Sequence, residues 1–210
     1  MGNANLSLFL LAAVMIAAIP GPGIFYVTAR TLSGGRRAGI ASTFGTALGG
    51  LVHVVAGGLG VSAIILASAQ LFTGLKLAGA LYLIWLGIQT FRAAGHVAPE
   101  QIAPVGAARA FREGVVVEAL NPKTAAFFLA FIPQFLDPAA GHTALQFMAL
   151  GLISVALNTF ADVIVVAAAS AARVHLTRNP GFIQRLRQGS GLFLAGLGIS
   201  LALARRPSPA

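Results

Sequence analysis

The chain has 210 residues, of which 57% are hydrophobic and only 9% charged, and its mean hydropathy is +0.86. Soluble domains carry about 25% charged residues, so this composition predicts an integral membrane protein. The net charge of +9 does not indicate nucleic-acid binding, because the basic residues lie between apolar runs and form no basic face with interleaved aromatics. The lack of cysteine excludes disulfides, thiolate metal sites and thiol redox chemistry.

Apolar runs long enough to cross a bilayer recur along the whole chain. A transmembrane helix needs about 20 apolar residues. The expected spans are residues 6–29, 39–67, 70–91, 115–136, 143–172 and 188–204. The first run has no positive n-region and no small-residue cleavage site, so it is interpreted as a retained span rather than a signal peptide. The sequence therefore predicts an all-α integral membrane protein with six transmembrane helices, in a single membrane domain of residues 1–210.

Two of these runs, the first and the fourth, contain helix breakers where a helix ought to continue. The first break is Pro-Gly-Pro-Gly at residues 20–23, and the second is Asn-Pro-Lys at residues 121–123, one hundred residues later. Each break opens a three-helix unit, residues 1–92 and 115–210, joined by a polar connector at 93–114. Two units of three spans must have opposite orientations, which predicts an inverted repeat with its site at the discontinuous helices, a recurrent transporter design.

The first break has a functional and a structural interpretation. Pro20, Gly21, Pro22 and Gly23 interrupt the helix, and the half-helix that starts near Ile24 would present free amides and a positive dipole end to an anion such as a carboxylate. The alternative is a packing kink, since proline and glycine are common in transmembrane helices. Four adjacent breakers cost several kcal/mol in a helix interior, which favours the functional interpretation.

The second break, Asn121 and Pro122, places a lysine inside the membrane. Asn121 lies about seven residues, roughly 10 Å, from the cytoplasmic end of its span, at a depth similar to that of Ile24, and Lys123 follows it. A charge at that depth is costly unless it is paired or lines water. We therefore expect Lys123 to bind a substrate carboxylate or an internal acid; the alternative is a lysine that snorkels to the headgroups. The two breaks should face each other across one cavity.

Four further polar residues are candidates for coupling or for a polar cavity. Asp162 lies near mid-membrane with Asn158 one turn away, and a carboxyl group in a low dielectric can exchange protons near neutral pH. A structural ion pair or hydrogen bond is the alternative. Glu118 could pair with Lys123, cap the break or face the cytoplasm. His53, between glycines of the second span, is more often a packing residue than a proton relay.

The distribution of Lys and Arg predicts the orientation. Loops after the first, third and fifth spans hold Arg30, Arg36, Arg37, Arg92, Arg109, Arg112, Arg173, Arg178, Arg185 and Arg187, whereas the opposite side holds Lys76, Arg205 and Arg206. The odd loops are therefore expected in the cytoplasm and both termini outside.

No catalytic motif is present: the chain has no Gly-x-Ser-x-Gly elbow, no His-Glu-x-x-His and no phosphate loop. We predict neither an enzyme nor a bound cofactor. A metal carrier would need several Asp, Glu, His or Cys ligands within its spans, and only Asp162 and His53 are well placed.

These residues resemble the LysE/RhtB family of bacterial amino-acid exporters. The matching stretches are PGPG (20–23), GRRAGIASTFGTALGGLVH (35–53), LKLAGALYLIWLGIQTFR (75–92) and ALNPKTAAFFLAFIPQFLDP (119–138). The resemblance implies a multi-pass protein of the bacterial cytoplasmic (inner) membrane that exports amino acids or their derivatives by exchange with protons. It marks Pro20, Gly21, Pro22, Asn121, Pro122 and Lys123 as signature positions, and Asp162 less securely.

The leading hypothesis is a secondary transporter that works by alternating access, with an amino acid or derivative and protons as its partners besides membrane lipid. Its substrate carboxylate would dock near residues 21–24 with Lys123 or Asn121, while Asp162, with Glu118 or His53, would bind the proton or the substrate ammonium. The alternatives are an exporter of another small metabolite or ion and a membrane scaffold without transport. The glycine-rich helix faces could also mediate a homodimer.

Overall fold

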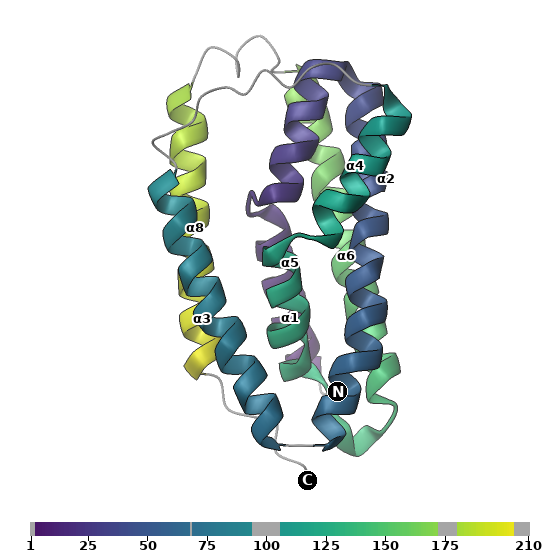
Figure 1. Cartoon of the computed structure of the whole chain (residues 1–210), viewed down its shortest axis with the longest axis vertical. Helices are drawn as coiled ribbons and strands as arrows, with labels where there is room; N and C mark the ends of the chain where they lie inside the picture. Colours follow the sequence, from purple (N-terminus) through teal and green to yellow (C-terminus); the bar gives the residue numbers. More distant parts are fainter. Residues whose placement is uncertain (1–2, 68, 94–105, 172–179, 204–210) are drawn as a thin grey trace.

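A computed structural model describes residues 3–67, 69–93, 106–171 and 180–203 of the chain, and these residues are almost entirely helical (Figure 1). The elements in chain order are α1 (Asn3–Ala18), α2 (Pro22–Ala67), α3 (Ala69–Ala93), α4 (Ala107–Ala119), α5 (Pro122–Ala126), the π-helix η2 (Phe127–Phe131), the 3₁₀ turns η3 (Ile132–Phe135) and η4 (Pro138–Ala140), α6 (Thr143–Ala171) and α8 (Pro180–Leu203).

The first break separates α1 from α2. Helix α1 ends at Ala18, and α2 begins with Pro22 in its first position, where the missing N–H of proline costs no hydrogen bond. The basic segment 30–37, expected as a loop, is instead helical except at Gly35, whose φ of 75° is accessible to glycine at little cost. At Gly35 the chain reverses direction, so that α2 comprises two arms side by side (Figure 1).

The second break separates α4 from α5 with a bend of 41°. The Asn121 side chain caps α5 by accepting a hydrogen bond from the backbone N–H of Lys123, and Pro122 again occupies the first helical position. Beyond α5 the helix widens to η2 and then tightens to η3. Pro133 lies in η3 and has no N–H to donate to an α-helical ladder, which accounts for the irregular geometry there.

The long arm of α2 packs along α4 and α6, and small residues let the backbones approach closely. A Cβ on Gly45 would collide with the carbonyl oxygen of Phe111, and one on Gly49 would lie 2.5 Å from the carbonyl oxygen of Val115. Gly57 in turn packs against the ring of Phe147 of α6. Gly45, Gly49 and Gly57 are separated by multiples of four residues, so they share the face of α2 that packs against α4 and α6.

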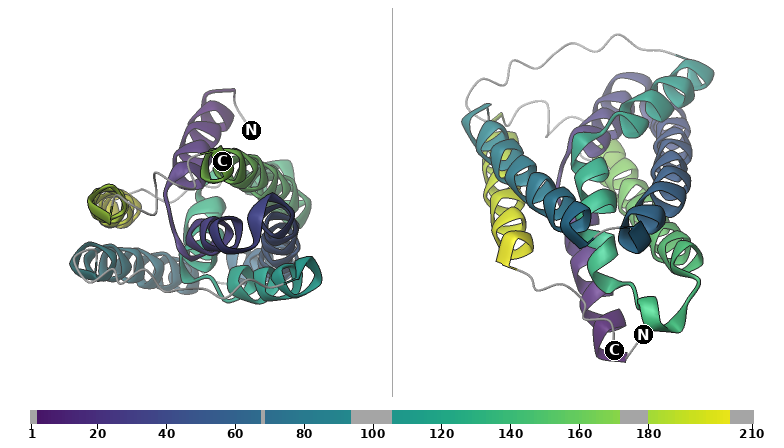
Figure 2. Two further views of the ribbon diagram at one scale, coloured as in Figure 1. Left: turned by 90° about the horizontal axis from the view of Figure 1, so that it is seen from above. Right: turned by 60° about the horizontal axis from the view of Figure 1, so that its bottom comes forward.

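Helices α3 and α8 form a pair that stands beside the rest of the bundle (Figures 1 and 2). Gly198 permits their close contact, because a Cβ there would lie 2.6 Å from the carbonyl oxygen of Ala80. The pair touches the other helices mainly through α3, where Gly79 meets Ala130 of η2. The packing thus joins helices from both sequence halves, α2 with α4 and α6, and α3 with α8.

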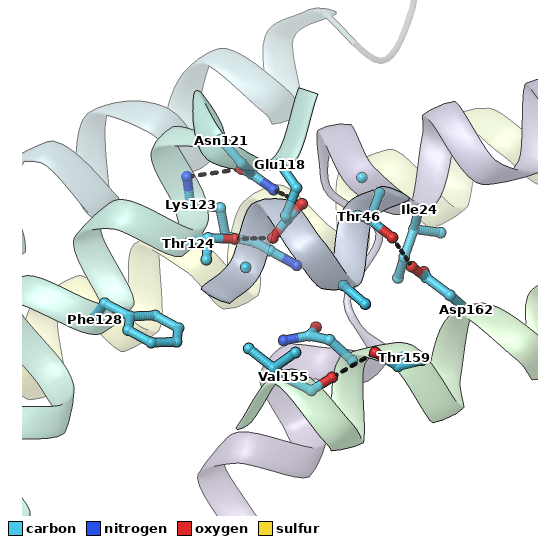
Figure 3. A pocket seen from close by; sticks show the side chains of 14 residues that line it. Ile24, Thr46, Glu118, Asn121, Lys123, Thr124, Phe128, Val155, Thr159 and Asp162 are labelled. Atoms are coloured by element: carbon cyan, nitrogen blue, oxygen red, sulfur yellow. Dashed lines mark hydrogen bonds between the residues drawn. The ribbon is translucent and has the colours of Figure 1, made fainter. Parts of the chain in front are cut away.

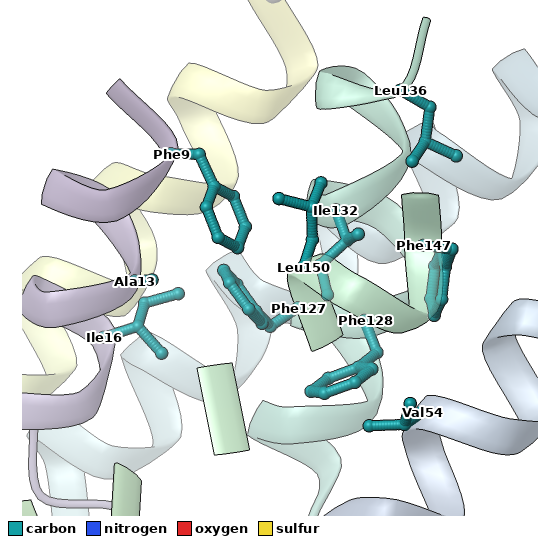
Figure 4. Packing of buried hydrophobic residues seen from close by; sticks show 10 residues of the cluster. All are labelled: Phe9, Ala13, Ile16, Val54, Phe127, Phe128, Ile132, Leu136, Phe147 and Leu150. Carbon is teal, nitrogen blue, oxygen red and sulfur yellow. The ribbon is translucent and has the colours of Figure 1, made fainter. Parts of the chain in front are cut away.

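A core of aromatic and aliphatic side chains fills the space between α1, η2, η3 and α6 (Figure 4). Phe9 of α1 lies against Phe127 and Phe135, with ring centroids 6.5 and 5.3 Å apart. The ring of Phe128 lies at a tilt against that of Phe147 of α6, with centroids 6.1 Å apart. This core holds the two broken helices against each other directly beside their breaks.

Many large apolar side chains point outward, as expected for helices in lipid. Among the described residues, α2 (over Pro22–Gly60) and α6 are long and apolar enough to cross a membrane, and α4 with the segment Pro122–Phe135 is a third if the bent pair forms one span. Six spans and an inverted repeat remain predictions. The two broken segments, α1–α2 and α4–α5, do run antiparallel with their breaks at a similar height (Figure 1).

Candidate functional site

The two breaks meet inside the bundle. The ammonium of Lys123 donates hydrogen bonds to the carbonyl oxygens of Ile16, at 3.3 Å, and Ile19, at 3.0 Å. These carbonyls lie at the end of α1, where the helix dipole is negative and the last backbone oxygens lack donors from a following helical turn. The Ile16 oxygen also accepts a hydrogen bond from the N–H of Ile19 at 3.2 Å. A Cβ on Gly21 would lie 3.0 Å from the Lys123 Cε. Lys123, which belongs to the second break, thus binds backbone carbonyl oxygens that the first break exposes.

Glu118 lies at the opposite side of the breaks from Lys123's carbonyl partners, next to the first turns of α2 and α5. Its carboxylate accepts hydrogen bonds from Asn121 Nδ2, at 2.8 Å, and from the Thr124 hydroxyl, at 2.6 Å. A Cβ on Gly23 would lie 2.6 Å from Glu118 Oε2, so this carboxylate also adjoins the first turn of α2. Helix N-termini favour negative charge. The location predicted for a substrate carboxylate is therefore next to a carboxylate of the protein itself.

Neither carboxylate of the site forms an ion pair with Lys123: among the described residues, no pair within 4 Å joins Lys123 to Glu118 or Asp162. Of the three possibilities left open for Glu118, the ion pair with Lys123 is not formed: neutral donors bind the Glu118 carboxylate, and carbonyl oxygens at the end of α1 bind the Lys123 ammonium. Asp162, buried on α6, accepts a hydrogen bond from the Thr46 hydroxyl of α2 at 2.9 Å. Asn158 donates to Ser154 O of its own helix.

A small cavity lies between these groups (Figure 3). It leaves about 20 Å³ for the centre of a water-sized solute, and about 10–15 Å³ of such space holds one water. The cavity therefore has room for one or two waters and none for an amino acid. Its lining residues are Gly23, Ile24, Thr46, Ala47, Gly50, Glu118, Asn121, Lys123, Thr124, Phe128, Val155, Asn158, Thr159 and Asp162.

The structure brings most of the predicted candidates to this one wall, namely Gly23, Ile24, Glu118, Asn121, Lys123, Asn158 and Asp162. Four others lie at the breaks without lining the cavity: Pro20, Gly21, Pro22 and Pro122. His53 lies outside it as well. Its Nε2 is 2.9 Å from the carbonyl oxygen of Glu118, which can only accept, so Nε2 donates and the ring holds α2 against the end of α4.

Sequence reasoning missed the threonines of the site. Thr46, Thr124 and Thr159 line the cavity, and the first two bind its carboxylates directly. One signal was available: Thr46 lies four residues before Gly50, so the two share one face of a helix with small residues. A threonine in an apolar helix is nevertheless usually satisfied by its own backbone, so its position alone did not single it out.

A second polar cluster joins α2 to α4 near the predicted cytoplasmic surface. The Arg30 guanidinium, which lies over the Tyr26 ring, pairs with Glu113. Tyr26 OH donates to the carbonyl oxygen of Ala110 at 2.8 Å, and Arg109 Nε donates to Glu113 at 2.7 Å. The hydrogen bond from Arg109, with the charge of Arg30, holds the pKa of Glu113 below its usual value despite partial burial. This network fastens two elements of the bundle above the cavity.

In the part of the chain that the structure describes, no group of three or more His, Asp or Glu side chains could hold a metal ion. What the site does contain is one cation and two carboxylates from three different elements, at the junction of two broken helices in an apolar bundle. Such an arrangement is typical of the binding sites of secondary transporters.

Comparison with known proteins agrees with this class. The family model described as LysE type translocator matches residues 14–205, and the chain belongs to this family. An uncharacterized membrane protein of Vibrio cholerae is 34% identical over 201 residues, covering 94% of this chain and 96% of the relative. The homoserine/homoserine lactone efflux protein of Salmonella typhimurium is 32% identical, covering 94% and 95%. The leucine efflux protein of the same species is 29% identical over 153 residues, 71% of each chain. No solved structure matches the chain.

Proposed function

We propose that this translocator exports amino acids or amino-acid derivatives across the bacterial inner membrane by proton antiport with alternating access. The observation that carries the proposal is the small cavity at the two breaks, into which α5, α4 and α6 contribute the buried residues Lys123, Glu118 and Asp162. Buried charges of both signs suit a zwitterionic solute. A buried cation can replace the water around its carboxylate, and a buried carboxylate can replace the water around its ammonium. Relatives named for efflux of homoserine and leucine support this substrate class.

The substrate carboxylate is proposed to bind Lys123 and the amides of Gly23 and Ile24. Among the described residues, the backbone N–H of Ile24 has no hydrogen-bond partner, whereas that of Phe25 binds Gly21 O. Binding there requires the Glu118 carboxylate to give way, since the two anions would otherwise adjoin each other. The substrate ammonium then interacts with Asp162 or Glu118. Each buried charge of the site then has a partner in both states: a group of the protein when the site is empty, and a group of the substrate when it is bound.

The cavity must open for any amino acid to enter, because its volume has room for only one or two waters. Its lining residues belong to α2, α4, α5, η2 and α6 and to the break at Asn121. We propose that the cavity opens by movement at the two breaks, where no continuous helix holds α1 to α2 or α4 to α5. The close contacts of Gly45, Gly49 and Gly57 can then persist.

Counterflow in proteoliposomes tests the proposal. Purified protein is reconstituted, the vesicles are loaded with unlabelled amino acid, and uptake of the labelled compound is followed across a broad panel. We expect counterflow for a subset of amino acids, and accumulation in vesicles with an acidic lumen, since protons that leave drive substrate inward. A complete lack of counterflow over the panel, in either direction of the pH gradient, would rule out the amino-acid proposal.

A further inference from the structure

The Thr46 hydroxyl lies between two acceptors. Its Oγ1 is 2.8 Å from the carbonyl oxygen of Thr43 in the same helix and 2.9 Å from Oδ2 of Asp162 on α6. All three residues are buried. A hydroxyl has one hydrogen to donate and lone pairs to accept with. It can therefore donate to only one of these two oxygens at a time.

The protonation state of Asp162 decides which one. When Asp162 is ionised, its oxygens only accept, so the Thr46 hydrogen must point to Oδ2. When Asp162 holds a proton on Oδ2, it can donate to Thr46 Oγ1, and Thr46 then donates to Thr43 O. Both states keep the carboxyl group hydrogen-bonded. The Thr43 carbonyl tolerates either state, because it lies within α2 and is also the acceptor of the helical ladder.

We propose that Thr46 is a positioning residue that lets Asp162 take up and release a proton inside the bundle without leaving a buried polar group unpaired. The proton comes from water that reaches the cavity and returns to water there, and no other bond forms or breaks. This role rests on the proposed proton coupling, and it names a device for it: rotation of one hydroxyl hydrogen.

The other polar groups around Asp162 are bound elsewhere, so Thr46 is the residue that can hydrogen-bond its carboxyl group. Besides Asp162, the charged groups of the cavity wall are Glu118 of α4 and Lys123 of α5. Glu118 is bound by neutral donors, and Lys123 by the carbonyls of α1. On α6, Asn158 and Thr159 bind carbonyls of their own helix. Among the described residues, the only hydrogen bond to the Asp162 carboxyl group comes from Thr46.

The test follows the carboxyl group itself, independently of transport. Infrared difference spectra of the purified, folded protein record the band of protonated carboxyl groups as pH is varied, and Asp162→Asn identifies the contribution of Asp162. Thr46→Val keeps the side-chain shape but removes the hydroxyl. A hydrogen bond to a charged group favours ionisation, so we expect the Asp162 midpoint of Thr46→Val to move to higher pH by about one to two units. Thr46→Ser should restore the wild-type midpoint.

Thr43→Val is the matched control, because Thr43 is also buried on α2 but its hydroxyl binds Gly39 O and not Asp162. It should leave the midpoint unchanged. A wild-type midpoint in Thr46→Val, or an equal shift in Thr43→Val, would overturn the proposal, and so would the lack of any band removed by Asp162→Asn. Counterflow measured on the same variants separates the two ideas: a shifted midpoint without amino-acid transport leaves Thr46 in its role and refutes the proposed substrate class.

Discussion

The contact between α2 and α4 depends on the absence of a single methyl group at Gly45. A Cβ placed there would overlap the carbonyl oxygen of Phe111 and come within 3.1 Å of its Cα, and these atoms belong to the helix backbone, which cannot rotate away. Gly45→Ala therefore has to move the helices apart. Overpacking of this kind costs about 1–3 kcal/mol. Because α2 and α4 both contribute residues to the site, the loss of stability also reports how strongly these two helices are packed together.

Gly60→Ala is the matched control for this substitution. Gly60 lies in the same helix, is exposed, and has no neighbour within 4 Å of an added Cβ. Both substitutions gain the same intrinsic helix propensity of about 1 kcal/mol, which cancels in the comparison. The free energy of unfolding of the two variants should thus differ by about 1–3 kcal/mol, the overpacking cost alone. Reversible unfolding by SDS in mixed micelles, followed by circular dichroism, measures it; equal stabilities would refute the packing described for α2 and α4.

Three further predictions concern the site and the network above it. Lys123→Met should lower transport about 10–150-fold, because it removes a hydrogen bond from a charged group that is worth about 1.5–3 kcal/mol. Arg112 is exposed, so Arg112→Met should leave transport unchanged. An equal loss of transport in both variants would contradict this prediction. Asn121→Ala should be less stable than Asn121→Ser by about 0.5–2 kcal/mol in thermal unfolding, since both variants lose the hydrogen bond to Glu118 but serine still caps α5. The pKa of Glu113 is lower in the folded protein than in the unfolded chain. Its network therefore stabilises the fold at pH values above the pKa of the unfolded chain, and this stabilisation disappears as pH falls through the pKa of the folded protein. Acid unfolding of Glu113→Gln should lack this pH-dependent component.

The helices and their two breaks could be predicted from the sequence because proline and glycine act locally. Pro22 and Pro122 both start half-helices, and α6 begins at the predicted Thr143. The segment 30–37 was predicted as a loop because it is basic, yet basic side chains are compatible with a helix, and only Gly35 departs from helical geometry. Helix α8 begins at Pro180, earlier than the apolar run of 188–204 indicates, since polar residues can extend a helix beyond its apolar part.

The candidate site was predictable as a set of residues, whereas the partners of its charges were not. The intramembrane charges Lys123 and Asp162 are visible in the sequence because they are costly there. That Lys123 binds carbonyls of α1 and that Glu118 adjoins the start of α2 depends on how the two breaks cross, which no spacing gives. Thr46 was missed for the same reason: its importance comes from facing Asp162 on a helix 116 residues away.

The central claim is that the cavity between the two breaks carries an amino acid across the membrane in exchange for protons. Counterflow of labelled amino acids into proteoliposomes, compared between the wild type and Asp162→Asn, tests it most directly. The wild type should accumulate at least one amino acid when the lumen is acidic, and Asp162→Asn should lose this response while remaining folded. An acid-driven accumulation that persists unchanged in Asp162→Asn, or counterflow for no amino acid at all, would contradict the claim.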